Sequence, residues 1–337
     1  MHYTKPAQYP SNNFDALRLL AALAVLYSHQ YPVTATPPPL WMNVAMIGGV
    51  AVMTFFVISG YLVTLSWQTH PRLWLFIGKR VLRIWPALIV VVLLASLALG
   101  PSFTTLSLSE YVHHGATWDY LRNIQLQTRF LLPGVFATNP LSNSVNGPLW
   151  TIPIEVSCYA ILAACGFFGL LRWQGVWLLA CIGYLAWFLT NKTMDLTGIM
   201  DHHYEFPAYF AFGSLIATFK TQFLQHRWRY ALLASVIAAA TYLAGFKYSA
   251  LLLFLPAILI SIGTSSWPVL SQAGRFGDVS YGVYLYAFPI QQSVYALWPD
   301  LGFTASLFIV TVLTLIAGWL SWQLVEAPTL RLKRYLR

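Results

Sequence analysis

The chain has 337 residues, of which 58% are hydrophobic and 9% are charged. Soluble domains carry about 25% charged residues, so this composition excludes an ordinary soluble globular protein. The net charge of +9 does not indicate nucleic-acid binding, because the basic residues are scattered between apolar runs and form no soluble patch.

Ten apolar stretches follow one another along the chain, and a membrane helix needs about 20 residues. They predict an all-α polytopic transmembrane bundle, residues 1–337 forming a single membrane domain with no separate soluble domain. The first stretch follows a weakly basic leader and is closed by no small-residue cleavage site, so we expect no cleavable signal peptide. The predicted spans are 15–34, 44–67, 82–100, 148–171, 174–190, 206–220, 229–246, 249–266, 279–297 and 302–325.

The basic residues orient these spans. With the N-terminus in the cytoplasm, 15 of the 19 lysines and arginines fall at cytoplasmic ends. The positive-inside rule therefore predicts that both termini are cytoplasmic. The longest connection, 101–147, then lies outside and has room for short helices.

The first span carries ionisable residues, and such groups within a membrane usually have a function. Arg18 and His29 are eleven residues apart, which places them on one helix face and roughly 16 Å apart along the axis. Asp15 lies three residues before Arg18 and can pair with it. Snorkelling of Arg18 to the interface and a structural hydrogen bond of His29 to a neighbouring helix are the alternative interpretations.

The second span contains the sequence FFVISGYL. Ser59 and Gly60 are typical of a close contact between helices, where small residues are favoured. A serine nucleophile is the alternative function for Ser59.

The third and fourth spans add three more ionisable residues. Arg80 and Arg83 are three residues apart at the predicted cytoplasmic mouth of a helix, where guanidinium groups suit phosphate. A simple positive-inside anchor is the alternative. Glu155 follows Trp150 by five residues, so we expect it in the outer half of the membrane, near His29. There it can orient the imidazole, or serve as a structural carboxylate bonded to Ser or Tyr.

Cysteines and the remaining histidines give weaker signals. Cys158, Cys165 and Cys181 lie within apolar stretches and are typical packing residues. The adjacent pairs His113–His114 and His202–His203 make no metal site by themselves, and we expect no metal.

Several of these stretches together resemble the bacterial membrane acyltransferase-3 family, which O-acylates sugars at the cell envelope. Weaker matches to the family lie further along the chain. The matching stretches are FDALRLLAALAVLYSH, FFVISGYL, KRVLRIWPAL and PLWTIPIEVSCYAI, followed by YFAFGSLIA, SYGVYLYAFPI and WQLVEAP.

The resemblance implies a ten-span enzyme of the bacterial cytoplasmic (inner) membrane that uses cytoplasmic acyl-CoA, usually acetyl-CoA. It assigns catalysis to His29 and Glu155. It matches the family's arginines with Arg18, Arg80 and Arg83, which we expect to bind acyl-CoA. Asp15, Ser59 and Arg275 are possible additional site residues from their own position and chemistry. The expected acceptor is a glycan or lipid-linked sugar, and membrane lipid and separate envelope-biosynthesis proteins are expected partners.

The sequence departs from the family near the ninth span, where many members have a histidine and this chain has Ala287. Two chemistries fit the remaining residues. His29 acts either as general base on an acceptor hydroxyl or as a nucleophile that carries the acyl group. A transporter or flippase explains the spans and the buried ionisable groups as well, and a non-catalytic scaffold leaves the face shared by Arg18 and His29 unexplained.

Overall fold

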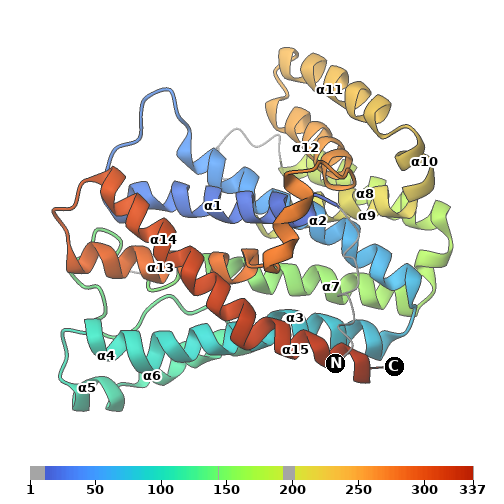
Figure 1. Ribbon diagram of the computed structural model, residues 1–337. Helices are drawn as coiled ribbons and strands as arrows, with labels where there is room; N and C mark the ends of the chain where they lie inside the picture. Colours follow the sequence, from blue (N-terminus) through green and yellow to red (C-terminus); the bar gives the residue numbers. More distant parts are fainter. Residues whose placement is uncertain (1–11, 143, 193–201, 337) are drawn as a thin grey trace. The chain divides into compact units, whose positions relative to one another are not determined.

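The computed structural model describes residues 12–142, 144–192 and 202–336 (Figure 1). Within these ranges the chain is helical and has no β-strand, apart from an isolated bridge between Thr104 and Val135. The prediction of an all-α protein is therefore confirmed for the described part of the chain.

Each of the ten predicted spans overlaps a helix of at least 17 residues. Proline lies inside several of these helices, as membrane helices tolerate. The ten are α1 (Phe14–Val33), α2 (Val44–Thr69), α3 (Leu73–Leu94), α7 (Thr151–Phe167), α8 (Gln174–Lys192), α9 (His202–Thr218), α11 (Arg227–Leu243), α12 (Lys247–Gly263), α13 (Ser280–Leu297) and α14 (Phe303–Ser321).

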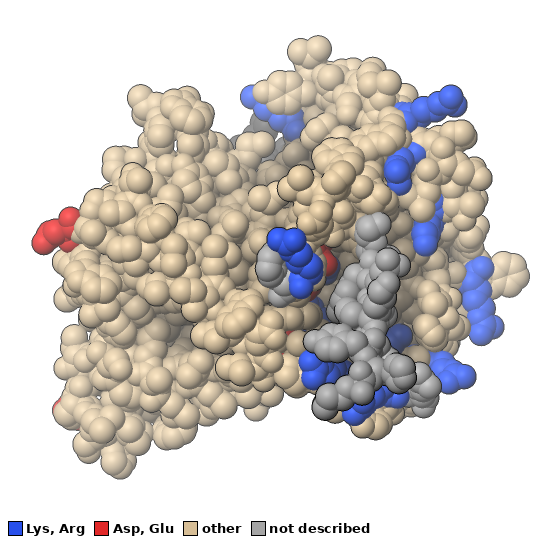
Figure 2. All heavy atoms as spheres, viewed as in Figure 1, with Lys and Arg blue, Asp and Glu red and all other residues tan. Residues whose placement is uncertain are grey.

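Four helical segments of the described residues combine the length and the hydropathy that a bilayer crossing requires. They are Val44–Thr69, Leu73–Phe103, Gly147–Phe167 and Phe303–Tyr335. Their surfaces carry many exposed large apolar side chains, and most of the face in Figure 2 is neither acidic nor basic. The other predicted spans are helices whose crossing of the membrane stays a prediction.

The third span begins earlier than the hydropathy pattern indicates. We expected it to start at residue 82, but α3 starts at Leu73 and continues through a π-helical turn, Ala95–Leu99, and α4 (Gly100–Phe103). The basic residues lower the local hydropathy without interrupting the helical backbone. Arg80 and Arg83 therefore lie in the second and third turns of α3 and not at its first residues. Their position at the cytoplasmic mouth of the span stays a prediction.

The chain divides into two compact units that alternate along the sequence. Unit 1 comprises residues 1–20, 53–71 and 161–278, and unit 2 comprises residues 21–52, 72–160 and 279–337. Helices α1, α2 and α7 each contribute one part to each unit.

Unit 1 packs the middle and end of α2 against α9, beside the helix pairs α8–α9 and α11–α12. A Cβ atom on Gly60 would overlap the backbone oxygen of Phe210, and one on Gly213 would overlap the oxygen of Val57. This reciprocal contact confirms that Gly60 serves close helix packing. Short helices η4 (Leu170–Arg172), α10 (Lys220–Gln225) and η5 (Leu270–Phe276) connect the longer ones.

Unit 2 is built around the antiparallel pair α13–α14, with α3 packed against α13 (Figure 1). A Cβ atom on Gly282 of α13 would lie 2.8 Å from the Cα of Gly318 on α14, so the two backbones approach closely. Ala287 packs in an apolar cluster with Leu26 of α1. The chain ends in η6 (Trp322–Glu326), which is a π-helical turn, α15 (Ala327–Arg331) and η7 (Leu332–Tyr335).

The long connection after α4 holds the expected short helices, α5 (Leu108–His113), α6 (Gly115–Asp119) and η2 (Tyr120–Gln125). Helix α5 begins with a capping box, in which Ser107 and Glu110 each bond the backbone N–H of the other. These hydrogen bonds from Ser107 hold the pKa of the Glu110 carboxyl below its usual value. A second short helix, η3 (Gly147–Trp150), leads into α7.

Candidate active site

His29 lies near the C-terminal end of α1, in the part of that helix that belongs to unit 2. Its Nδ1 is 2.8 Å from the backbone oxygen of Val25, one turn earlier. A carbonyl oxygen only accepts, so Nδ1 carries the proton and Nε2 of the neutral ring has the free lone pair. The ring of Phe288 on α13 meets the imidazole edge-on, with 5.4 Å between centroids. This arrangement presents Nε2 as a base.

Glu155 and Arg80 are linked through Tyr159. The Tyr159 hydroxyl donates a hydrogen bond to Oε1 of Glu155, one turn earlier on α7. The guanidinium of Arg80 lies 5.8 Å from the centroid of the Tyr159 ring and 5.9 Å from that of Phe76. The buried Nε of Arg80 has no partner. The structure therefore brings Glu155 and Arg80 into one polar cluster, and an orienting role of Glu155 toward His29 stays a prediction.

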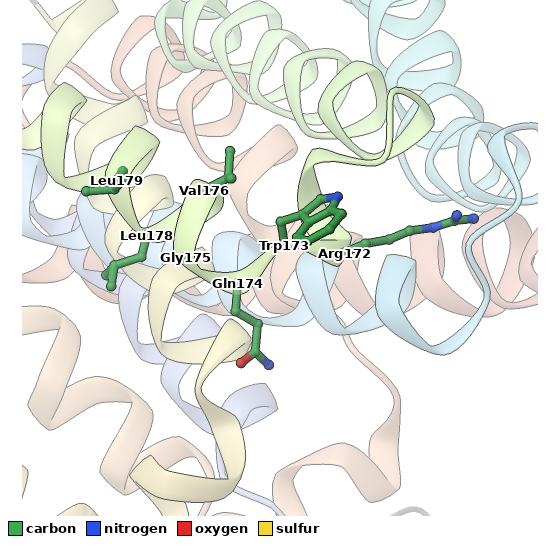
Figure 3. A pocket seen from close by; sticks show the side chains of 7 residues that line it. All are labelled: Arg172, Trp173, Gln174, Gly175, Val176, Leu178 and Leu179. Atoms are coloured by element: carbon green, nitrogen blue, oxygen red, sulfur yellow. The ribbon is translucent and has the colours of Figure 1, made fainter.

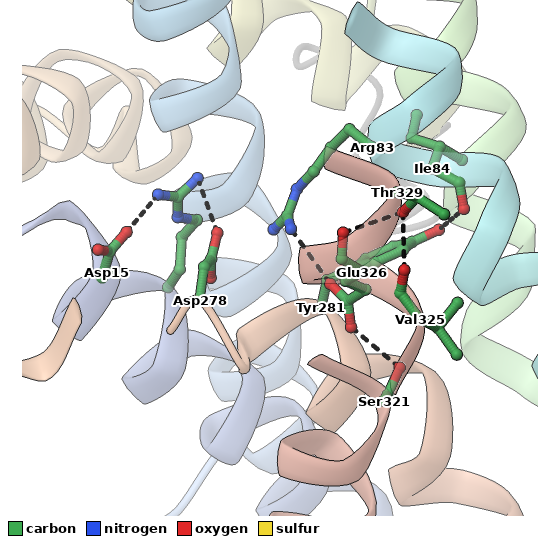
Figure 4. Close-up of polar contacts among 10 residues, drawn as sticks. Asp15, Arg83, Ile84, Asp278, Tyr281, Ser321, Val325, Glu326 and Thr329 are labelled. Carbon is green, nitrogen blue, oxygen red and sulfur yellow. Dashed lines mark hydrogen bonds and ion pairs between the residues drawn. The ribbon is translucent and has the colours of Figure 1, made fainter. Parts of the chain in front are cut away.

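Arg83 is held by a buried carboxylate. Its Nη1 is 3.2 Å from Oε2 of Glu326, which is 1% exposed (Figure 4). Ser321 donates to the other oxygen of Glu326 at 3.0 Å. The π-helical turn η6 contains Glu326, and such turns often mark functional sites. Arg83 also lies over the ring of Tyr281, 5.4 Å from its centroid, and Tyr281 donates to the backbone oxygen of Ile84 at 3.0 Å.

Arg18 belongs to unit 1 and pairs with two carboxylates, those of Asp15 and Asp278, which Figure 4 labels. The expected pair with Asp15 is present at 2.6 Å, and Asp278 lies 3.5 Å from the other terminal nitrogen of Arg18. Two carboxylates within this range compensate its charge, while its Nε is buried without a partner. Arg18 is thus less available to a phosphate than the sequence indicated.

The two remaining candidates of unit 1 occupy different elements. Ser59 is partly buried on α2, next to the Gly60 contact. Arg275 is exposed in η5, and its Nη1 lies 3.3 Å from Oε1 of Gln272. A role in the site stays a prediction for both residues.

Sequence reasoning missed Tyr159, Tyr281, Asp278 and Glu326. Glu326 carried the available signal, because it is an acid within an otherwise apolar terminal stretch. The tyrosines gave none, since tyrosine is common in membrane helices and only tertiary packing places these two against arginines.

Unit 1 also has two surface hollows away from these residues. One, of about 630 Å³, lies at the start of α8, where Figure 3 shows Arg172, Trp173 and Gln174 with apolar neighbours. The other, of about 600 Å³, includes Arg172 and Lys220 in its lining. In the described part of the chain, no group of three or more His, Cys, Asp or Glu side chains is arranged to hold a metal ion.

The described residues form helices, and four of the helical segments are long and apolar enough to cross a membrane, as in a membrane protein. Residues 11–323 match the acyltransferase domain family. The chain therefore belongs to the acyltransferase-3 family, and it is an acyltransferase.

Two curated proteins are similar over nearly their full lengths. The O-acetyl transferase of Shigella phage Sf6 is 31% identical over 330 residues, which cover 94% of this chain and 96% of that protein. Nodulation protein 10 of Rhizobium leguminosarum bv. viciae is 26% identical over 372 residues, covering 96% and 95% of the two chains. No solved structure matches the chain significantly.

Proposed function

We propose that this protein is a multi-pass O-acyltransferase of the bacterial cytoplasmic membrane. It takes an acyl group, acetyl by preference, from cytoplasmic acyl-CoA and transfers it to a hydroxyl of an extracytoplasmic glycan or lipid-linked sugar. The observation that carries the proposal is His29, an imidazole within a long helix whose Nδ1–H is bound to Val25, so that Nε2 serves as a base. The similarity to an O-acetyl transferase favours acetyl and favours transfer over transport.

The arginines of α3 are the proposed contacts of the acyl-CoA phosphates. Arg80 is the stronger candidate, because its buried Nε has no partner. Its guanidinium lies over the rings of Phe76 and Tyr159 and interacts with Tyr159 and Glu155. Arg83 is already bonded to Glu326. Arg18 and His29 lie roughly 16 Å apart along α1, a span comparable to the extended arm of CoA.

Two reaction routes remain open. In the direct route, Nε2 of His29 removes the proton of the acceptor hydroxyl, whose oxygen attacks the thioester carbonyl carbon. The carbon–sulfur bond breaks, CoA leaves as a thiolate that takes up a proton, and an ester remains on the acceptor. In the second route, Nε2 itself attacks the thioester, and the acyl-imidazole then reacts with the hydroxyl. The direct route needs no activation of the imidazole as a nucleophile, and we prefer it for that reason.

The test is His29→Ala in cells whose envelope glycans are analysed by mass spectrometry. We expect the acetyl ester present with the native chain to be lost, because general-base catalysis contributes roughly 10²–10⁴-fold. The amount of the variant in the membrane should equal that of the native chain.

His113→Ala is the matched control. His113 makes the same bond, from Nδ1 to the backbone oxygen four residues earlier, at 2.8 Å, but lies exposed on α5. The His113→Ala variant should leave acetylation unchanged. Normal acetylation in the His29 variant would overturn the proposal.

A further inference from the structure

Two buried side-chain amides of unit 2 have an oxygen without a hydrogen-bond partner. Asn146 and Gln291 are each 1% exposed. Asn146 donates from Nδ2 to the backbone oxygen of Leu285 at 2.9 Å. Gln291 donates from Nε2 to the backbone oxygen of Leu26 at 2.9 Å and to Oε1 of Gln30 at 2.8 Å. Oδ1 of Asn146 and Oε1 of Gln291 are buried and unpaired.

The orientation of both amides is fixed by their partners. A backbone carbonyl only accepts, so the NH₂ group of each amide must face it and the oxygen must face away. Rotating either amide would bring two oxygens together. Both unpaired atoms are therefore acceptors, and buried acceptors normally find a donor.

Asn146 precedes a residue that packs on the ring in contact with His29, and Gln291 lies one turn from that ring along α13. Phe288 meets the His29 imidazole at 5.4 Å. A Cβ atom on Gly147, the residue after Asn146, would lie 3.4 Å from the Phe288 ring. Gln291 lies one turn beyond Phe288 on α13. It bonds α1 at Leu26, three residues before His29, and at Gln30, the residue after it.

The other buried amides described in this region have no buried, unpaired oxygen. In the neighbouring Gln292, both the oxygen and the NH₂ group of the side-chain amide are hydrogen-bonded. Its Oε1 accepts from Asn139 at 2.9 Å, and its Nε2 donates to the backbone oxygens of Leu141 and Ser144 at 2.7 Å each. In the described residues, Asn146 and Gln291 are the only side-chain amides with a buried, unpaired oxygen.

We propose that Oδ1 of Asn146 and Oε1 of Gln291 bind hydroxyl groups of the acceptor sugar, beside the hydroxyl that His29 deprotonates. The inference rests on the proposed function. A sugar ring has hydroxyls on neighbouring carbons, all of them donors, whereas the acetyl thioester end of the donor has none. Asn146 also belongs to the predicted extracytoplasmic stretch 101–147, from which the acceptor arrives. Sites that hydrogen-bond a substrate hydroxyl discriminate strongly against analogues that lack it.

The test measures KM for the acceptor oligosaccharide and KM for acetyl-CoA in membranes that contain the full chain. Radiolabelled acetyl-CoA is the donor, and lipid-linked oligosaccharide extracted from the source bacterium is the acceptor probe. Asn146→Ala and Gln291→Met should each raise KM for the oligosaccharide roughly threefold to tenfold, the effect of one neutral hydrogen bond. KM for acetyl-CoA should stay the same, and rates are expressed per folded molecule after size-exclusion chromatography.

Gln292→Met is the matched control, because it removes an equally buried amide from the next position of α13. It should lower the amount of folded protein and leave KM for the oligosaccharide unchanged. An unchanged KM for the oligosaccharide in both test variants would overturn the inference, and so would a rise in KM for acetyl-CoA alone. If the native chain transfers no label, the proposed function fails and this inference fails with it.

Discussion

Arg80 and Arg83 lie one turn apart on α3, and their guanidinium groups have different partners. Arg83 binds Glu326, which is 1% exposed, at 3.2 Å. Arg80 lies over the rings of Phe76 and Tyr159. We therefore expect removal of Arg83 to affect folding and removal of Arg80 to affect acyl-CoA affinity.

Arg83→Ala should reduce the amount of folded protein, because it removes the guanidinium that lies 3.2 Å from the buried carboxylate of Glu326. Breaking a buried ion pair in this way costs about 3–5 kcal/mol. The double variant Arg83→Ala/Glu326→Gln should recover most of the folded protein, measured by size-exclusion chromatography in detergent. Arg80→Ala should fold and lose acyl-CoA affinity in a titration of the purified protein.

Two results would contradict this division. One is full folding of the single Arg83→Ala variant, which would mean that the Glu326 charge is solvated. The other is unchanged acyl-CoA affinity in Arg80→Ala. Arg122→Ala, which removes an exposed arginine of η2, serves as the control for charge alone.

Single residues were predictable where the chemistry is local. His29 and Arg80 stand out because ionisable groups are rare in apolar helices. The pair of Asp15 with Arg18 follows from their spacing along one helix. The partners Tyr159 and Glu326 were not predictable, because they contact the arginines from other helices and sequence spacing carries no information about those contacts.

At the scale of elements, the contact between α2 and α9 in unit 1 depends on two glycines that face each other's backbones. Next to them, Thr64 of α2 donates to Ser214 of α9 at 2.7 Å, and Trp177 of α8 donates to the same hydroxyl at 3.1 Å. Close backbone approach and buried hydrogen bonds stabilise packing between apolar helices.

Gly60→Ala and Gly213→Ala should each destabilise this contact, because the added methyl group overlaps a backbone oxygen that has no freedom to move aside. Overpacking typically costs about 1–3 kcal/mol. The measurement is the fraction of protein that remains monodisperse in detergent after a heat challenge.

Gly183→Ala on α8 is the matched control, since an added Cβ atom there meets nothing within 4 Å. Alanine is favoured over glycine in helices by about 1 kcal/mol. This variant should be as stable as the native chain or slightly more stable. Equal losses in all three variants would show that the glycines act through flexibility and not through packing.

The helices themselves were predictable from hydropathy, and their ends were less so. Helix α3 starts nine residues before the predicted start of the third span, because Lys79, Arg80 and Arg83 lower the hydropathy of its first turns. Helix α9 likewise begins at His202, before the apolar residues. A hydropathy pattern marks where a helix is apolar, while backbone hydrogen bonds decide where it begins and ends.

At the scale of the whole molecule, helix length and the distribution of basic residues indicate different numbers of membrane spans. Four helical segments satisfy length and hydropathy together. The basic residues, however, alternate consistently over ten helices, with 15 of 19 at the predicted cytoplasmic ends. The shorter helices α9, α11 and α12 have 17 residues each, which is the lower limit for a span.

Ten spans predict a defined alternation in the labelling of single cysteines. In a chain without Cys158, Cys165 and Cys181, cysteines placed at four exposed connections are treated with a membrane-impermeant maleimide. The four positions are Ser109, Thr221, Ala244 and Ser266. Positions 109 and 244 should react in spheroplasts with an intact inner membrane. Positions 221 and 266 should react only after that membrane is permeabilised.

This alternation is expected because each crossing of the membrane by α9, α11 or α12 puts the next connection on the opposite side. If these helices only lay on the membrane surface or within the protein, positions 221, 244 and 266 would all share one side. Equal labelling of these three positions would therefore reject the ten-span topology. It would also remove the separation between a cytoplasmic donor and an external acceptor, on which the proposed transfer depends. The alternating labelling pattern would instead place the 101–147 stretch, with Asn146, on the same side of the membrane as the acceptor.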